Sequence, residues 1–410
     1  MATVDKQYRL PFVLVTSLFL LWGLANNMTD TLLAAFKRIM SMSDTQTSLI
    51  QFAFYGAYFC FALPAALYIK RYSYKSGIIL GLCLYAGGAM LFWPAAQAAS
   101  YAFYLIAIYI MAGGCSVLET TANPYIFSMG SPETATRRLN IAQAFNPIGS
   151  IVGILMSKFF ILDNISLQSV SGTYAVLGLI LLAIMIVMIC IKMPLGRDTS
   201  NSPSLRSSLQ RLVRNRRYRG GVIAQFFYVG AQICVWSFTI RIVMQELNVT
   251  EPVAANIYLL SIVGFCLSRF IYTWLMKYIA PERLLLIGSV LSIISTALVI
   301  ITSGRTLTIA LILISIFMSL MFPTIYGIAL EGVENPAYGG QHGDAKLGAS
   351  GLIMAILGGA ILTPLMGFLS DNTSINFAYI VPLICFIIVM IYAAIESHRK
   401  QTLQPTALQS

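Results

Sequence analysis

Residues 11–36 read PFVLVTSLFLLWGLANNMTDTLLAAF, a long apolar stretch that contains Asn26, Asn27 and Asp30 beyond its middle. A helix of about 20 apolar residues is long enough to cross the hydrocarbon core of a membrane. The stretch lacks a small-residue cleavage site, so we expect a retained membrane-spanning helix and not a signal peptide. An acid inside such a helix is costly to insert, which makes Asp30 a candidate functional residue.

The composition of the whole chain fits repeated crossing of a membrane. Of its 410 residues, 58% are hydrophobic and only 10% are charged, and the mean hydropathy is +0.79. Such a chain is too apolar for a soluble protein of this length. The apolar runs predict an all-α membrane protein with twelve transmembrane helices, placed at 11–36, 46–69, 75–96, 101–127, 138–160, 172–192, 218–244, 252–276, 281–302, 305–330, 346–370 and 374–396.

The basic residues are distributed unevenly between the two ends of these spans. If the N-terminus is cytoplasmic, most of the 26 Lys and Arg residues fall on the cytoplasmic side. The other side receives only Lys37, Arg38, Lys158, Arg241 and Arg305, while Arg269 falls inside a span. Since cytoplasmic loops of membrane proteins carry an excess of Lys and Arg, both termini are expected in the cytoplasm. The net charge of +11 then reflects topology, and no nucleic-acid partner is expected.

The predicted spans fall into two equal groups. The loop 193–217 is rich in Ser, Pro and Arg and predicts a linker between an N-terminal six-helix bundle, 1–192, and a C-terminal one, 218–410. Two parallel halves with a ligand site at their interface are typical of the major facilitator architecture. Pro124 and Pro323, in the fourth and tenth spans, indicate broken or kinked helices.

Polar side chains gather within three spans of the N-terminal half. Residues four apart share one helix face, and so do residues three apart. The polar residues are Asn26, Asn27 and Asp30 in the first span, Glu119 and Asn123 in the fourth, and Asn140, Gln143 and Asn146 in the fifth. Convergent carboxylates and amides supply the donors and acceptors that sugar hydroxyl groups need. This pattern favours a polyol substrate over a hydrophobic one.

The two intramembrane acids, Asp30 and Glu119, have two interpretations. One is a structural carboxylate paired with an amide or a backbone group. The other is a proton carrier, because burial favours the protonated form of a carboxyl group and lets it load and release a proton near neutral pH. Proton symport is the hypothesis that accounts for keeping both acids inside the membrane.

The C-terminal half offers one intramembrane base and several polar candidates. Arg269 cannot lose its proton, so it needs partners or water. It either binds substrate hydroxyl groups, pairs with an acid of the N-terminal half, or extends to the membrane surface as a structural residue. Other candidate lining residues, each equally able to bond neighbouring helices, are Gln225, Tyr228, Gln232 and Trp236 in the seventh span.

Several classes of chemistry find no support in the sequence. No nucleotide-binding loop is present, so ATP-driven pumping by this chain is not expected. The only histidines, His342 and His398, lie outside the predicted spans, and neither a metal site nor a nucleophile with a histidine base is indicated. We therefore expect no cofactor and no enzymatic activity, and the short loops argue against a membrane-embedded enzyme or receptor.

Several motifs together resemble the fucose permease branch of the major facilitator superfamily, the fucose-galactose-glucose:proton symporters. They are Phe19 to Asp30, Leu118 to Pro124, Arg138 to Asn146, Tyr228 to Gln232, Ser268 to Phe270 and Gly367 to Asp371. The loop 68–75 keeps Lys70, Arg71 and Lys75 but lacks the acid of the general facilitator signature.

The resemblance implies import of L-fucose or another hexose together with a proton, across a bacterial inner membrane and by a monomer. Asp30 and Glu119 would then couple protons, while Glu119 also faces the substrate cavity. Residues matching Asn27, Gln143, Asn146 and Arg269 line or neighbour the sugar site in this branch. The alternative is a uniporter or efflux carrier for another small polar solute, with structural acids.

Overall fold

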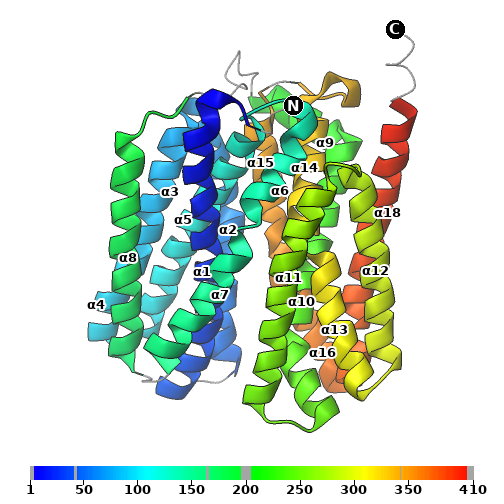
Figure 1. The fold of residues 1–410 in the computed structure, drawn as a ribbon. Helices are drawn as coiled ribbons and strands as arrows, with labels where there is room; N and C mark the ends of the chain where they lie inside the picture. Colours follow the sequence, from blue (N-terminus) through cyan, green and yellow to red (C-terminus); the bar gives the residue numbers. More distant parts are fainter. Residues whose placement is uncertain (1–3, 41–43, 163–165, 195–204, 342, 404–410) are drawn as a thin grey trace. The chain divides into compact units, whose positions relative to one another are not determined.

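The computed structural model describes residues 4–40, 44–162, 166–194, 205–341 and 343–403 (Figure 1). Within these ranges the chain forms helices and no strand. Twelve of the helical segments found there are long and apolar enough to cross a membrane. The predicted all-α class and the twelve predicted spans are thereby confirmed.

The chain forms two compact units. Unit 1, which is mainly the N-terminal half, also includes a short C-terminal segment, and unit 2, which is mainly the C-terminal half, also includes a short N-terminal segment. Unit 1 comprises Met1–Ala135, Phe145–Leu209 and Gln341–Met354, and unit 2 comprises Thr136–Ala144, Gln210–Gly340 and Ala355–Ser410. The predicted boundaries at 192 and 218 stay a prediction.

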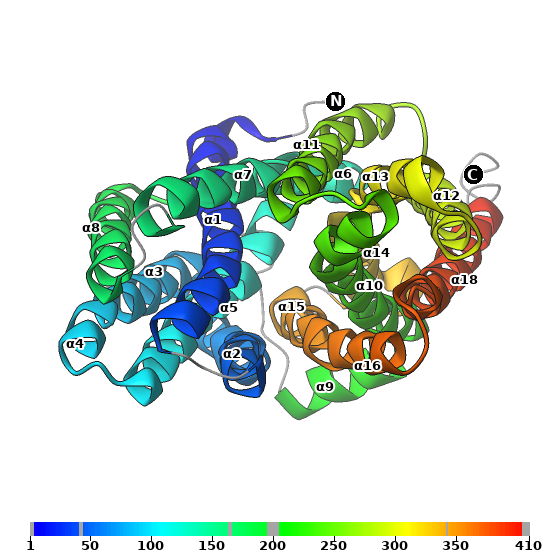
Figure 2. The ribbon, with the colours of Figure 1, turned by 90° about the horizontal axis from the view of Figure 1, so that it is seen from below.

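Several helices lie wholly or mainly in unit 1. They are α1 (Arg9–Ile39), α2 (Asp44–Arg71), α3 (Tyr74–Met90), α4 (Phe92–Gln97), α5 (Tyr101–Phe127), α7 (Asn146–Ser157), α8 (Leu167–Cys190) and α15 (Ala345–Met354). Short helical turns are η1 (Lys6–Tyr8), η2 (Pro132–Thr134) and the π-helix η3 (Lys158–Leu162). Figure 2 shows α1 beside α7, and α3 beside α5 and α8, and these helices are in contact.

Glycines let α1 and α7 approach each other closely. A Cβ atom at Gly23 would collide with the backbone oxygen of Asn146, and one at Gly149 would collide with that of Leu20. Helices within a membrane gain van der Waals contact when small residues allow their backbones to meet. This packing fixes the first span, which carries several of the predicted site residues, against the second part of the fifth.

The basic loop between α2 and α3 has a structural use. Ser73 and Ser76 form a capping box at the start of α3, each side chain accepting a hydrogen bond from the other's backbone N–H at 3.1 Å. The Nζ of Lys75 donates to the backbone oxygens of Ile189 and Ile191, at 2.7 and 2.8 Å, at the end of α8. A cation at a helix C-terminus satisfies carbonyls that the helix itself leaves open.

Unit 2 contains most of the remaining helices. They are α6 (Ala135–Gln143), α10 (Arg216–Leu247), α11 (Glu251–Leu275), α12 (Pro281–Ile301), α13 (Gly304–Met318), α14 (Met321–Glu334), α16 (Gly358–Asn372), α17 (Ile375–Ala378) and α18 (Ile380–Leu403), with the turns η5 (Pro336–Tyr338) and η6 (Ala355–Leu357). Helix α10 contacts α11, α13, α14, α16 and α18, while α9 (Leu205–Arg214) precedes it in the chain.

Five of the candidate spans within the described residues comprise two consecutive α-helices; the third consists of α3 and α4 and the twelfth of α17 and α18. The fifth consists of α6 and α7, the tenth of α13 and α14, and the eleventh of α15 and α16. The break between α13 and α14 precedes Pro323, as the sequence indicated, whereas Pro124 lies inside the uninterrupted α5. The break between α6 and α7 precedes Pro147. A proline has no backbone N–H, so the carbonyl four residues earlier lacks its usual helical hydrogen-bond donor.

Candidate transport site

Glu119 lies in α5 among residues that are more deeply buried than it is. Its side chain is partly exposed, whereas Thr120, Thr121 and Asn123 are fully buried. The hydroxyl group of Thr121 donates to the backbone oxygen of Val117 at 2.6 Å, within the same helix. Of these polar residues of α5, Glu119 is the one whose side chain is not fully buried. A group that is to exchange a proton with water or with a substrate needs such exposure.

Hydrogen bonds to neighbouring helices hold this part of α5 in place. The Nε1 of Trp22 in α1 donates to the backbone oxygen of Cys115 at 3.0 Å. The hydroxyl group of Ser116 donates to the backbone oxygen of Tyr58 in α2, also at 3.0 Å. Cys115 precedes Glu119 by one helical turn, so these bonds orient the face that carries the acid.

Asn27 of the first span and Asn146 of the fifth come from the packed pair α1 and α7, whereas Asn140 and Gln143 lie in α6. The Nδ2 of Asn27 donates to the backbone oxygen of Gly23 at 3.1 Å, and Gly23 packs against the backbone of Asn146. Both Asn27 and Asn146 are partly exposed. The side chains of Asn26 and Asp30, although they were predicted as site residues, lie outside the described residues.

Arg269 in α11 donates to backbone carbonyls at two helix ends, that of α6 and that of α13. Its side chain is 3% exposed; its Nε donates to the backbone oxygen of Ser319 at 2.7 Å, and its Nη1 donates to that of Gln143 at 2.9 Å. Ser319 precedes Pro323 by four residues, and Gln143 precedes Pro147 by four residues. Each proline leaves a carbonyl without its usual helical donor, and the guanidinium group supplies the missing donor to both.

An aromatic pair extends the surroundings of Arg269 toward α10. The guanidinium carbon lies 4.7 Å from the ring centroid of Phe265, and this ring lies 5.0 Å from that of Trp236 in an edge-to-face arrangement. The Nε1 of Trp236 donates to the hydroxyl group of Ser315 at 3.3 Å. The structure thus gathers Arg269, Trp236 and the backbone of Gln143 within unit 2. Gln232, one turn before Trp236, is partly exposed.

Two polar side chains of α10 have no hydrogen-bond partner among the described residues. They are Gln225 and Tyr228, and both are fully buried. A buried polar group without a partner is costly and points to a ligand or a water molecule that is to be bound. The sequence had identified both as candidate lining residues.

Sequence reasoning missed Phe265 and Ser319 as part of this site. Phe265 lies one helical turn before Arg269, a spacing that could have identified it. Ser319 contributes its backbone oxygen, so the type of its side chain does not indicate this role. Pro323, four residues later, indicates it, because a proline cannot donate to that oxygen. No group of three His, Cys, Asp or Glu residues able to hold a metal occurs in the described part of the chain.

The fold, the twelve spans and the buried polar residues define a class of protein. The model of the Major Facilitator Superfamily matches residues 14–343, and the chain belongs to this superfamily. It is accordingly a multi-pass membrane protein and a transporter, not an enzyme.

Within the superfamily, the chain belongs to the branch that sequence analysis indicated. It is 42% identical to the L-fucose-proton symporter of Haemophilus influenzae, over 95% of this chain and 97% of that one. It is 33% identical to a glucose/galactose transporter of Brucella abortus, over 96% and 95% of the two chains. A crystal structure of the Escherichia coli fucose:proton symporter superposes with a TM-score of 0.85 at 35% identity, covering 95% of this chain and 99% of that one.

Proposed function

We propose that this chain imports L-fucose, or a closely related hexose or deoxyhexose, together with a proton. The observation that carries the proposal is the 42% identity over nearly the whole length to a protein named for this transport. The partly exposed acid Glu119, among buried polar residues of α5, gives the proposal a chemical basis. The proton is the coupling ion, and no further cofactor takes part.

The proton-coupling residues in this proposal are Asp30 and Glu119. The sugar-binding residues are Asn26, Asn27, Glu119, Asn123, Gln143, Asn146, Gln232, Trp236 and Arg269. The two carbonyl bonds of Arg269 use two of the five N–H groups that a guanidinium carries. The remaining three N–H groups can donate hydrogen bonds to sugar hydroxyl groups. We place the chain in a bacterial cytoplasmic membrane as a functional monomer. The distribution of Lys and Arg supports placing both termini in the cytoplasm.

Transport in proteoliposomes tests the coupling. With wild-type protein, added L-fucose should make the external medium more alkaline, and an imposed proton gradient should concentrate the sugar inside. Glu119→Gln cannot carry a proton, so it should lose accumulation. It should still exchange labelled for unlabelled sugar, because exchange does not require release of a proton. The matched control is Glu133→Gln, which changes an exposed acid of η2 and should behave as wild type.

A second candidate substrate, glucose or galactose, is favoured by the 33% identity to the Brucella abortus transporter. Competition of each unlabelled sugar against labelled L-fucose uptake ranks the candidates directly. Sugar entry without accumulation by the wild type would instead indicate a uniporter. Accumulation by Glu119→Gln equal to that by wild type would remove Glu119 from the coupling mechanism.

A further inference from the structure

A second buried arginine, Arg217, organises the charged residues at one end of unit 2. It is 1% exposed at the start of α10. Its Nη2 lies 3.2 Å from a carboxylate oxygen of Glu282 and 2.9 Å from one of Glu331, and its Nε lies 3.1 Å from one of Glu396. The ring of Tyr338 lies 3.9 Å from its guanidinium carbon. Three acids from three other helices, α12, α14 and α18, therefore meet on one cation.

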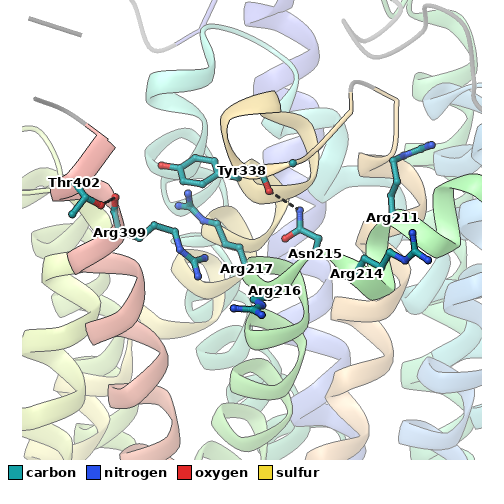
Figure 3. A pocket seen from close by; sticks show the side chains of 9 residues that line it. Arg211, Arg214, Asn215, Arg216, Arg217, Tyr338, Arg399 and Thr402 are labelled. Atoms are coloured by element: carbon teal, nitrogen blue, oxygen red, sulfur yellow. Dashed lines mark hydrogen bonds between the residues drawn. The ribbon is translucent and has the colours of Figure 1, made fainter. Parts of the chain in front are cut away.

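An open pocket of about 650 Å³ lies over this cluster (Figure 3). Its lining residues are Arg211, Arg214, Asn215, Arg216, Arg217, Tyr338, Gly339, Arg399 and Thr402. Five of the nine are arginines, and none carries a carboxylate. In Figure 3 these side chains come from the end of α9, the start of α10, the turn η5 and the end of α18.

The acids nearest the pocket do not neutralise it. Glu396 also accepts from Arg399 at 2.8 Å, and Glu282 accepts from Lys400 at 2.9 Å, so the three carboxylates are shared among several cations. Arg214 and Arg216 are exposed, and neither pairs with a carboxylate within the described ranges. The positive charges of Arg214 and Arg216 can therefore interact with an anion from outside the chain.

The start of α10 adds to the positive potential of the pocket. Asn215, its N-cap residue, accepts a hydrogen bond from the backbone N–H of Tyr218 at 3.0 Å. The same asparagine donates to the backbone oxygens of Gly332, at 2.7 Å, and of Tyr338, at 3.3 Å, which fixes it in the pocket wall. The positive end of a 32-residue helix thus opens onto the arginines, an arrangement suited to an oxyanion.

The exposed apolar residues of helix α9 indicate that such an anion would come from a membrane surface. Leu209 and Val213, one turn apart, are 41% and 64% exposed, while Arg211 and Arg214 of the same helix line the pocket. A helix with an exposed apolar edge beside a row of cations is typical of a segment at a membrane surface. Clusters of Lys and Arg next to transmembrane helices attract anionic lipid head groups.

We propose that this pocket binds a phosphate-bearing anion, with the arginines as ligands and the head group of an anionic phospholipid as its source. Arginine suits this chemistry because its planar fork of donors matches phosphate oxygens in pairs. The proposal is independent of which solute the chain carries.

Binding to the purified full-length protein in detergent tests this proposal. Native mass spectrometry counts the bound molecules while phosphatidylglycerol, zwitterionic phosphatidylcholine or inorganic phosphate is titrated. We expect phosphatidylglycerol to bind more tightly than phosphatidylcholine, and Arg214→Gln/Arg216→Gln to weaken its binding by about fivefold for each arginine. The matched control Arg206→Gln/Arg219→Gln changes two exposed arginines of α9 and α10 outside the pocket lining and should change binding less than about twofold.

The outcomes separate the two sources of phosphate. Arginine-dependent binding of phosphatidylglycerol without binding of inorganic phosphate identifies the head group, and arginine-dependent binding of inorganic phosphate identifies the free ion as a ligand. Equal loss in the pocket and control variants, or no binding to the wild type, overturns the proposal. If the double variant does not purify as a folded protein, Arg214→Gln alone should show the single fivefold loss.

Discussion

Unit 2 holds two buried arginines that are stabilised in different ways. Arg269, in the C-terminal half of α11, donates to two backbone carbonyls and lies over an aromatic ring. Arg217, at the start of α10, lies among three carboxylates. The guanidinium of Arg269 is stabilised by backbone carbonyls that lack a helical donor because a proline lies four residues later. The guanidinium of Arg217 is stabilised by negatively charged carboxylates. Removing the first leaves neutral groups behind, whereas removing the second leaves buried anions, so the two losses should differ.

Arg217→Met should give the largest effect. It leaves Glu282 and Glu396, which are 1% and 2% exposed, without their central cation. Breaking a buried ion pair from one side costs about 3–5 kcal/mol. Unfolding by titration with SDS measures the loss, and Arg219→Met, at an exposed position of the same helix, is the control. A loss no larger than that of the control would show that the carboxylates find other cations.

Arg269→Met should cost less, about 1–3 kcal/mol, because two carbonyls lose charged hydrogen bonds but no buried charge is left alone. The same titration with SDS gives the value. Arg269→Lys should recover only part of it, since a single ammonium group lacks the planar fork that reaches both Ser319 and Gln143. If Arg269→Met proved as damaging as Arg217→Met, the distinction between the two sites would fail.

Restoring a backbone donor should compensate for part of the loss at Arg269. In the Arg269→Met background, Pro323→Ala provides an N–H four residues after Ser319. We expect it to recover about 1 kcal/mol, the net contribution of one hydrogen bond. Pro281→Ala is the control, because Pro281 is at the first position of α12, where the N–H has no helical acceptor. Equal effects of the two substitutions would contradict the role assigned to Pro323.

The smallest effect is expected at the edge of the Arg217 cluster. Lys400 donates to both carboxylate oxygens of Glu282, at 2.9 and 3.0 Å, but it is 29% exposed. Lys400→Gln should therefore cost no more than about 1 kcal/mol, as for other ion pairs near water. The loss should shrink further when the titration is repeated at high salt. A loss approaching that of Arg217→Met would mean that Lys400 is as essential to the cluster as its centre.

The two arginines also differ in how far the sequence could identify them. Arg269 stands inside an apolar run, so hydropathy alone marks it as unusual. Arg217 stands at the edge of a run among other basic residues, where the positive-inside rule accounts for it without a partner. From the sequence alone, Arg217 is therefore one of the basic residues that indicate the topology. Nothing in the spacing of Glu282, Glu331 and Glu396 along the chain indicates that they converge.

The sequence by itself determined the class, the twelve spans and the family, because the cost of placing polar groups in hydrocarbon is set by local composition. It also marked Glu119 and Arg269 as residues to be explained. Only the tertiary structure decided their partners. Arg269 meets carbonyls that lie 50 and 126 residues away, and Arg217 meets carboxylates 65 and 114 residues away. Hydrogen bonds and ion pairs act over a few ångströms, so they depend on which helices pack together, and this is a property of the folded chain.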